Sequence, residues 1–275
     1  MDINAQVKQH LDDITLVLKD DYNYPADNIL GIFLQGSQNY GLDYEGSDVD
    51  TKLIVVPTLK DIAMNNKPIS TTYVRPSDSA HTDLKDVRLY METFKKANIN
   101  FVEILFTDYK YINEYYLPEW NELVKNREAI AIYNPARAIK SMVGVALEKY
   151  HALEHPYPIA AQEIAKYGYS AKQLHHLARV RYFLEDYLLE HNYKDCLNPD
   201  GKTKKILMRL KTTHLPLKEA RILAQEYLTT IKDMEKEAMT WYDINVYDKT
   251  VLDLFDTVQY QIIEKGLRKE IITKS

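Results

Sequence analysis

Two stretches decide the expected fold: Gly36-Ser37-Gln38-Asn39-Tyr40-Gly41 and, shortly after it, Ser47-Asp48-Val49-Asp50-Thr51. The first is a turn of small and polar residues, and the second places two carboxylates one residue apart. If residues 48–56 form a strand, successive side chains point to opposite faces, so Asp48 and Asp50 share one face. Two like charges held that close repel each other unless something positive lies between them.

The residues around these stretches predict strands. An apolar run at residues 29–34 leads directly into Gly36, and residues 53–56 are apolar throughout, as expected for a strand covered on both faces. Residues 86–90 alternate and predict a third strand, whereas residues 69–83 are mostly polar and predict a long connection. Helical spacing of apolar residues follows at 91–106, as it does earlier at 5–19.

Strand signals largely vanish after about residue 120. Asn134-Pro135 predicts a helix start, and Ser170 is a candidate N-cap for a helix that reaches about residue 190. Further helices are predicted around 202–211, 217–239 and 250–268. We therefore expect an α+β fold with two domains, a mixed α/β domain at residues 1–118 and an α-helical domain at residues 119–275.

Composition bounds the function. The chain has 275 residues, of which 45% are hydrophobic, so it is long enough to bury a full core. Its formal net charge of -5 argues against binding a polyanion by bulk attraction, although a local basic groove remains open. The single cysteine, Cys196, excludes an internal disulfide. The N-terminus lacks a secretion signal and no apolar run is long enough to span a bilayer, so we expect a cytoplasmic protein.

The paired aspartates predict a divalent metal that carries a nucleotide. In nucleotidyl transfer, charge develops on the attacking and leaving oxygens, and two Mg²⁺ ions held by carboxylates stabilise both. Asp48 and Asp50 supply the minimum ligand set, and a third carboxylate from a neighbouring strand would complete it. Asp86 is the first candidate and Asp83 the second, although either could instead cap a turn. The alternative interpretation of the motif is a polar loop in which Asp48 caps a turn.

The turn before the aspartates suits a triphosphate. Gly36 allows the backbone to approach phosphates closely, and the Ser37 hydroxyl with nearby amides can bind their oxygens. If Ser37 begins a helix, the partial positive charge of the helix N-terminus adds to this.

The same residues resemble a known superfamily. Gly36-Ser37, Gly41 and residues 47–50 match the signature of the DNA polymerase β-like nucleotidyltransferases. Further stretches resemble the predicted nucleotidyltransferases associated with RNA ligases in bacteria and phages: residues 86–90, 94–98, 103–106, 172–179 and 206–217. The resemblance implies a polymerase β-like domain with a mixed sheet, followed by a helical domain. It also implies a role for Glu103, whose alternative is a pairing or capping residue on a helix surface.

Two segments depart from that family. It usually has Gly-Asn-Pro where this chain has Ala97-Asn98-Ile99, and Arg-x-Gly-Glu where this chain has residues 211–214, Lys-Thr-Thr-His. These departures put the details of the substrate in question more than the metal site.

Three basic residues recur at helical spacing in the second half. Lys172, His176 and Arg179 lie at i, i+4 and i+7, so one helix face carries all three, and the resemblance implies that they bind the triphosphate. A solvated charged stripe is the alternative. A basic cluster between residues 202 and 211 could contact a nucleic-acid backbone or simply be a solvated helix face.

The function expected from the sequence is a Mg²⁺-dependent nucleotidyltransferase that uses a nucleoside triphosphate. Asp48 and Asp50 would bind both metal ions, and Asp86 would complete the site and help deprotonate an acceptor hydroxyl. The resemblance implies that the acceptor is an RNA end. Two alternatives stay open: transfer to a protein or small molecule, and a non-catalytic module that keeps the fold.

Overall fold

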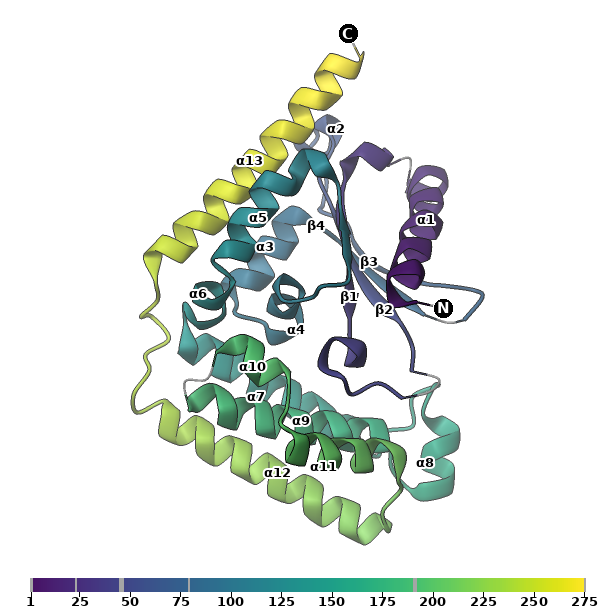
Figure 1. Ribbon diagram of the computed structural model, residues 1–275, viewed down its shortest axis with the longest axis vertical. Coiled ribbons are helices and arrows are strands. Elements are labelled where there is room, and N and C mark those ends of the chain that lie inside the picture. The colour runs from purple at the N-terminus through teal and green to yellow at the C-terminus, as the bar shows by residue number, and fades with distance from the viewer. Residues whose placement is uncertain (1, 23, 45–46, 79, 190–191, 275) are drawn as a thin grey trace. The chain divides into compact units, whose positions relative to one another are not determined.

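The structure is a computed structural model that describes residues 2–22, 24–44, 47–78, 80–189 and 192–274. The chain forms two compact units, one built from residues 1–130 and 248–275 and the other from residues 131–247. Figure 1 shows the mixed first unit, with its sheet, and the helical second unit.

The first unit contains the whole sheet. Its strands are β1 (Ile29–Gln35), β2 (Asp50–Val55), β3 (Ser70–Val74), β4 (His81–Asp86) and β5 (Lys110–Ile112). Its α-helices are α1 (Ile3–Tyr22), α2 (Leu59–Ala63), α3 (Val87–Lys95), α4 (Ile99–Val102), α5 (Leu117–Lys125) and α13 (Lys249–Lys274). Four 3₁₀ helices complete it, η1 (Ala26–Asn28), η2 (Ser37–Tyr40), η3 (Glu103–Leu105) and η4 (Glu114–Tyr116).

The strands of the described residues form one five-stranded sheet in the order β3-β4-β2-β1-β5. Strands β2 and β4 run parallel, whereas the β1–β2, β1–β5 and β3–β4 pairs are antiparallel. The predicted α+β class with a mixed sheet is confirmed. In the register, Gln35 of β1 lies beside Asp50, and Asp83 of β4 lies beside Lys52.

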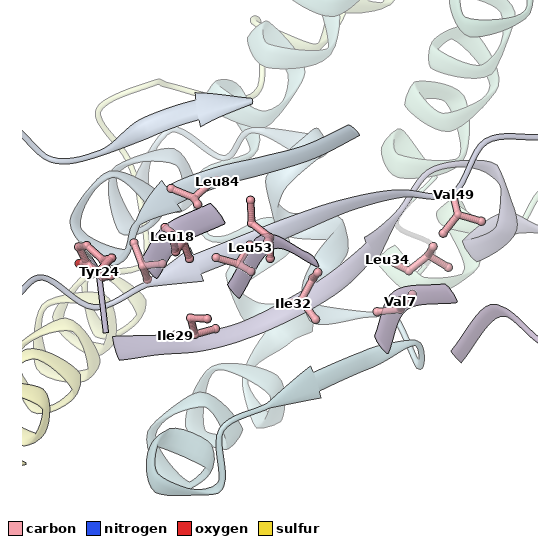
Figure 2. Packing of buried hydrophobic residues seen from close by; sticks show 11 residues of the cluster. Val7, Leu18, Tyr24, Ile29, Ile32, Leu34, Val49, Leu53 and Leu84 are labelled. Carbon is pink, nitrogen blue, oxygen red and sulfur yellow. The ribbon is translucent and has the colours of Figure 1, made fainter. Parts of the chain in front are cut away.

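Helix α1 covers one face of the sheet because its apolar residues recur at helical spacing. Val7, Ile14 and Leu18 are buried on that helix and pack against residues of β1 and β2, among them Leu53 and Val55 (Figure 2). Fully burying such a side chain stabilises the fold by about 1.5–3 kcal/mol. The β2 residues that pack under α1, Leu53 and Val55, are odd-numbered, so the even-numbered residues Asp50 and Lys52 face away from α1.

Aromatic residues and helices α3, α5 and α13 cover the other face. Phe33 of β1 packs against Trp120 of α5 with ring centroids 4.6 Å apart, and Phe94 of α3 stacks on Phe255 of α13 at 5.8 Å. Gly266 on α13 allows a close approach, because an added Cβ would lie 2.8 Å from Cγ1 of Val56. This face is therefore closed over the middle of the sheet.

The third strand begins earlier than predicted. Strand β4 spans His81–Asp86, and residues 87–90, predicted as strand, are the first turn of α3. Val87, Tyr90 and Phe94 are all buried, and their spacing is that of a helix face. Over five residues the helical spacing of the apolar side chains resembles the alternation of a strand, which explains the wrong prediction for residues 87–90. Asp86 is the N-cap of α3 rather than the start of a strand.

Strand β3 lies where the sequence predicted a long connection, and no strand was predicted at β5. Strand β3 is an edge strand whose residues are all exposed or half-buried, so it lacks an apolar run. Strand β5 is a three-residue edge strand. Such strands depend on pairing with a neighbour more than on their own hydrophobic pattern.

The division of the chain differs from the expected boundary at residue 118. Helix α5 packs with the sheet, and α13 returns to the first unit, where it contacts α3 and α5. The helix near the C-terminus was predicted, but its packing partners are far away in the sequence and leave no local signal.

The second unit is made of helices. They are α7 (Pro135–Ala152), α8 (Ala161–Tyr167), α9 (Ala171–Leu188), α10 (Tyr193–Leu197), α11 (Gly201–Thr212) and α12 (Leu217–Ala238), while α6 (Arg127–Ile132) spans the boundary. Helices α7, α11 and α12 all pack on α9. Ser170 occupies the N-cap position of α9, but Glu163 Oε1, not the Ser170 hydroxyl, accepts the Ala171 N–H at 2.9 Å. Among the described residues, no helix has the length and apolar character required to cross a membrane.

Candidate functional site

The glycine turn at the end of β1 has a backbone that requires glycine. Gly36 has φ 101° and ψ -159°, and Gly41 has φ 60°. The combination at Gly36 is essentially restricted to glycine. Between them, η2 spans Ser37–Tyr40, so Ser37 does begin a helix, but a 3₁₀ turn of four residues is too short to supply a helix dipole.

Buried polar contacts hold this turn in place. Asn39 donates to the Leu34 carbonyl at 2.9 Å and accepts a hydrogen bond from the Thr107 hydroxyl at 2.7 Å. The Tyr40 hydroxyl donates to the Glu103 carboxylate, and both side chains are about 95% buried. Glu103 is therefore not on a helix surface: it is buried and anchors the glycine turn through Tyr40.

Asp50 is the first residue of β2. Its Oδ1 accepts the His81 N–H at 2.9 Å, and Nδ1 of His81 lies 3.4 Å from the same oxygen. The side chain of Asp50 is 33% exposed. The carboxylate is thus held in place while part of it stays open to solvent.

Asp48 precedes the strand instead of lying on it, because β2 begins at Asp50. Val49 between the two aspartates is buried in the core under α1, whereas Asp48 is exposed. The alternation of exposed and buried side chains that is typical of a strand therefore extends back to Asp48. Gln38 of the glycine turn donates to the Asp48 carbonyl at 2.7 Å, which ties the turn to the start of the motif.

A cavity of about 300 Å³ lies beside Asp50. It is lined by Gln35, Asp50, Thr51, Lys52, His81, Asp83, Asn100 and Phe101. Asp83 belongs to the β4 strand that runs parallel to β2, and it faces the same side of the sheet as Lys52, its register partner. The structure thus brings Asp50 and Asp83 to one cavity.

Two lysines lie among these carboxylates. Lys85 donates to both oxygens of Asp83, at 2.7 and 3.0 Å, and Lys52 donates to Gln35 Oε1 at 2.6 Å. The ammonium groups of Lys52 and Lys85 lie 4.7 and 5.1 Å from the centroid of the Phe101 ring. A cation over an aromatic face is stabilised by the ring quadrupole.

Lys52 is the most unusual charged residue of the cavity because it is only 2% exposed. Burial lowers its pKa to about 8, and the charge of Lys85 acts in the same direction, while Asp83 and Asp50 oppose the shift. Lys52 remains mostly protonated at neutral pH. It therefore supplies the positive charge that two nearby carboxylates require.

The carboxylates do not by themselves form a closed cage. Within the described part of the chain, no group of three or more His, Cys, Asp or Glu side chains is placed to hold a metal ion. The donor set at the cavity nevertheless fits Mg²⁺, because Asp50 and Asp83 present carboxylate oxygens, which this ion prefers, and it takes few ligands from protein.

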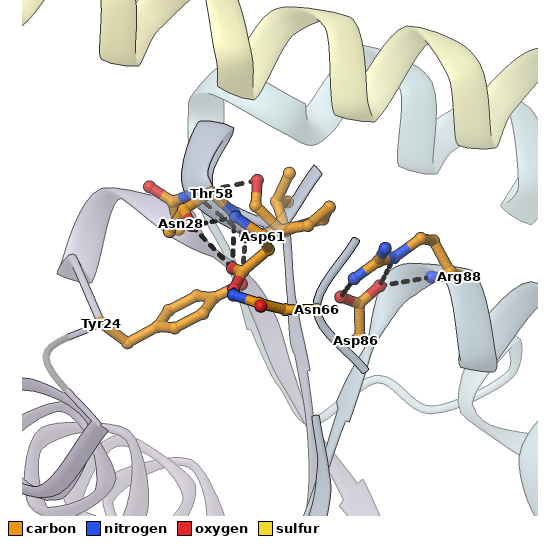
Figure 3. Close-up of polar contacts among 9 residues, drawn as sticks. Tyr24, Asn28, Thr58, Asp61, Asn66, Asp86 and Arg88 are labelled. Atoms are coloured by element: carbon orange, nitrogen blue, oxygen red, sulfur yellow. Dashed lines mark hydrogen bonds and ion pairs between the residues drawn. The ribbon is translucent and has the colours of Figure 1, made fainter. Parts of the chain in front are cut away.

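The structure does not bring Asp86 to this cavity. Its register partner is Val55, a core residue under α1, so Asp86 faces away from Asp50 and lies at the opposite end of the strand. Its carboxylate is 2% exposed and binds Arg88 through Nε at 2.9 Å, Nη2 at 2.6 Å and the backbone N–H at 2.8 Å (Figure 3). The contacts of Asp86 are those of the alternative role, a helix cap, and of the two candidate carboxylates Asp83 is the one that lines the cavity.

The three basic residues predicted to bind phosphate lie on α9 of the second unit. Lys172 is exposed, whereas His176 and Arg179 are partly buried. Burial, together with the charge of nearby cations, lowers the pKa of His176 well below its ordinary value, so its ring is neutral at pH 7. Their action on a triphosphate held by the first unit stays a prediction.

Sequence reasoning missed Lys52, His81, Gln35 and Phe101. One signal was present: Lys52 has the same parity as Asp50 on an otherwise apolar strand, so it had to share the face of that aspartate. Gln35 and His81 required the register of β1 and β4, and Phe101 required the packing of α4, none of which a local pattern reveals.

Comparisons with known proteins add little. No model of a protein family matches the chain, and no curated protein does. Among solved structures, the chain is similar to a nucleotidyltransferase-like protein from Exiguobacterium sibiricum 255-15, with 15% identity over 81% of this chain and 73% of that one, and a TM-score of 0.29. A likeness this weak supports no conclusion about this chain.

Proposed function

We propose that the chain is a Mg²⁺-dependent nucleotidyltransferase that transfers a nucleoside monophosphate from a nucleoside triphosphate to a hydroxyl acceptor. One observation carries the proposal. The sheet register places the glycine turn beside Asp50, since Gln35 pairs with Asp50, and places Asp83 on the same face of the adjacent parallel strand. A turn for phosphates and carboxylates for a metal are what this chemistry requires.

Three carboxylates have proposed roles. Asp50 and Asp83 would hold Mg²⁺, with Asp48 as a further ligand from the segment just before β2. The metal, when bound, would neutralise charge that develops on the transferring phosphoryl group and on both oxygens in line with it. The hydrogen bond from the His81 N–H fixes the orientation of Asp50. Asp83 replaces Asp86 as the residue proposed to accept the proton of the acceptor hydroxyl.

The lysines would act on the triphosphate directly. Lys52 lines the cavity, and Lys85 binds the lining residue Asp83, so a phosphate bound in the cavity would be attracted to both positive charges. Because Lys52 is buried and hydrogen-bonded, its charge is fixed in position before the substrate arrives. Gly36 and Ser37 would hold phosphate oxygens through the turn, and Lys172, His176 and Arg179 are proposed to contact the same triphosphate.

The proposed acceptor is an RNA end, which rests on the resemblance to RNA-ligase-associated nucleotidyltransferases. Transfer to a protein or small molecule uses the same site chemistry and is the second candidate acceptor. A non-catalytic nucleotide-binding module is favoured by one observation: Asp83 already binds Lys85, and Asp50 already binds the His81 N–H.

The test is transfer of label from α-³²P nucleoside triphosphates, each supplied with Mg²⁺, to RNA oligonucleotides and, separately, to a cell lysate. We expect labelled product with the wild type and none with Asp50→Asn. The matched control is Asp12→Asn, because Asp12 is an exposed residue of α1 whose side chain, within the described part of the chain, pairs with Lys8 alone.

Each outcome separates the candidates. Label on RNA supports the stated acceptor, and label on a lysate protein or metabolite alone moves the acceptor to the second candidate. Triphosphate binding by calorimetry without any transfer would establish the non-catalytic module. Equal transfer by wild type and Asp50→Asn would remove this cavity as the active site.

A further inference from the structure

Helix α11 of the second unit concentrates positive charge. It carries five basic and no acidic side chains, although the chain as a whole has a net charge of -5. The basic residues are Lys202, Lys204, Lys205, Arg209 and Lys211. Such an excess on one helix is a local feature that the overall composition hides.

The helix has a buried side and a charged side. Leu207 and Leu210 are buried, with 1% and 4% exposure, and α11 packs on α9. Lys202, Lys205 and Arg209 are exposed and follow one another at i, i+3 and i+7, which puts them along one face. At a rise of 1.5 Å per residue they span about 10 Å of helix. These three residues are called the basic face.

The charges of the basic face are not neutralised within the chain. In the residues that the structure describes, the side chains of Lys202, Lys205 and Arg209 take part in no ion pair with a carboxylate. Asp200, the nearest acidic residue before the helix, is its N-cap and accepts the Thr203 N–H at 2.6 Å. The Asp200 carboxylate also attracts Lys202, but one carboxylate cannot neutralise three cations, so the basic face keeps an excess of positive charge.

Helix α12 (Leu217–Ala238) shows that this is not a general property of the second unit. It also packs on α9, but it carries four basic and five acidic side chains. Its exposed lysines, Lys218, Lys232 and Lys236, each stand next to an acidic residue in the sequence. A solvated helix surface in this protein thus mixes its charges, and α11 does not.

More positive charge lies where α11 meets α9. His175 of α9 is buried and bonds through Nδ1 to the Leu207 carbonyl at 2.9 Å. Burial lowers the pKa of His175 to about 4, and Lys211, Arg179 and Lys172 contribute in the same direction. The cations of both helices are therefore close enough to affect one imidazole ring.

We propose that the basic face of α11 binds the sugar-phosphate backbone of an RNA molecule. A row of unpaired cations matches the repeated negative charge of that backbone, and the binding would be independent of sequence. The proposal deepens the proposed function by assigning a surface to the RNA acceptor. It can be measured without catalysis, so the two can fail separately.

The surface favours nucleic acid over a protein partner. A stable protein interface has an apolar core with its charges at the rim. No large hydrophobic side chain of α11 is exposed among the described residues. Charge without an apolar centre fits a phosphate backbone and not a packed protein interface.

The test is binding of a fluorescein-labelled RNA of mixed sequence, about 20 nucleotides long, followed by anisotropy at several salt concentrations. The test variant combines Lys202→Gln, Lys205→Gln and Arg209→Gln. The control combines Lys218→Gln, Lys232→Gln and Lys236→Gln on α12. Glutamine keeps the helix propensity close to that of lysine and arginine, and circular dichroism verifies that both variants are folded.

We expect the wild type and the control to bind with the same strong salt dependence. The test variant should bind at least about tenfold more weakly, and the slope of log K against log salt should fall by about 2, as expected for the loss of three contacts to a single strand. Equal weakening by both triple variants, or no RNA binding by the wild type, would overturn the proposal. RNA binding with no nucleotide transfer would retain it and reject the proposed function alone.

Discussion

Two aspartates of strand β4, three residues apart, have opposite surroundings. Asp83 lines a cavity together with Asp50 and Lys52, and its own partner is Lys85, which lies on the same face of the sheet. Asp86 is enclosed on the other face, where it binds Arg88 and caps a helix. The neighbours of a carboxylate, not its place in a motif, decide whether it can bind a metal.

The surroundings of Asp86 differ from the cavity in a second way. Near it, Thr58 and Asp61 form a capping box, Asn66 donates to Asp61 at 3.1 Å, and Asn28 donates to the Val56 carbonyl at 3.0 Å (Figure 3). These polar groups are satisfied by one another. At the cavity, carboxylates and ammonium groups instead surround about 300 Å³ of open space. One end of the sheet is built for stability and the other is available for a ligand.

The largest expected effect separates the two aspartates by activity. Asp83→Asn should reduce nucleotidyl transfer by about 10³-fold, since a metal-held charge stabilises the transition state by several kcal/mol. Asp86→Asn should change the rate little at a temperature where it stays folded. Initial rates of label transfer measure both. If Asp86→Asn were the more damaging of the two, the assignment of the third carboxylate would have to be reversed.

Asp86 should matter for stability instead. Asp86→Ala removes the partner of Arg88, a helix cap and a buried charge at once, and it should lower the free energy of unfolding by about 3 kcal/mol. Urea unfolding followed by circular dichroism measures it. Asp83→Ala is the matched control: the Asp83 side chain is 24% exposed against 2% for Asp86, and Asp83 caps no helix, so its loss should cost less than that of Asp86. Equal losses of unfolding free energy in the two variants would show that Asp83 contributes as much to stability as Asp86 does.

The sequence predicted these elements unevenly, for physical reasons. Strands β1 and β2 were evident because they are apolar and covered on both faces, and α9 and α12 because their periodicity is long. Most of strand β4 was assigned to a connection because His81, Asp83 and Lys85 make it polar, and these three residues lie on the face of the sheet that carries the candidate site. The feature that supplies the chemistry thus conceals the strand.

The candidate site was predictable in its local part only. Gly36 and Asp50 belong to one short motif, and their pairing through β1 and β2 follows from two neighbouring strands. The choice between Asp83 and Asp86 required the β2–β4 register, which is a contact between residues about 30 positions apart. No pattern within a single strand contains that information.

The buried charge of Lys52 gives a prediction with a defined pH window. Its folded pKa of about 8 lies below the ordinary value of 10.5, so the unfolded chain binds more protons between these two values. Stability relative to the neutral variant Lys52→Met should therefore rise as pH increases from about 8 to 10.5, by about 3 kcal/mol in total. Below pH 8 both states are protonated, and the burial penalty is fully present.

The measurement is urea unfolding of wild type and Lys52→Met at pH 7.5 and pH 10. Other groups that titrate in this range cancel in the comparison of the two proteins. At pH 7.5 we expect Lys52→Met to be as stable as the wild type or more so, while transfer activity falls. If the wild type were instead the more stable protein and its advantage in free energy of unfolding shrank as the pH rises, charged Lys52 would stabilise the fold. Its burial would then need no functional explanation.

The smallest effect is expected at the satisfied end of the sheet, in the capping box of α2. Thr58→Ala removes the hydroxyl that accepts the Asp61 N–H at 3.1 Å, and loss of an N-cap side chain costs about 1 kcal/mol. Thr58→Ser keeps the hydroxyl and should lower the free energy of unfolding by much less than Thr58→Ala does. Both variants should transfer nucleotide at the wild-type rate, because α2 contributes no residue to the cavity. A loss of activity in Thr58→Ala that Thr58→Ser does not share would show that the two ends of the sheet are coupled, and the contrast between them would then be one of degree.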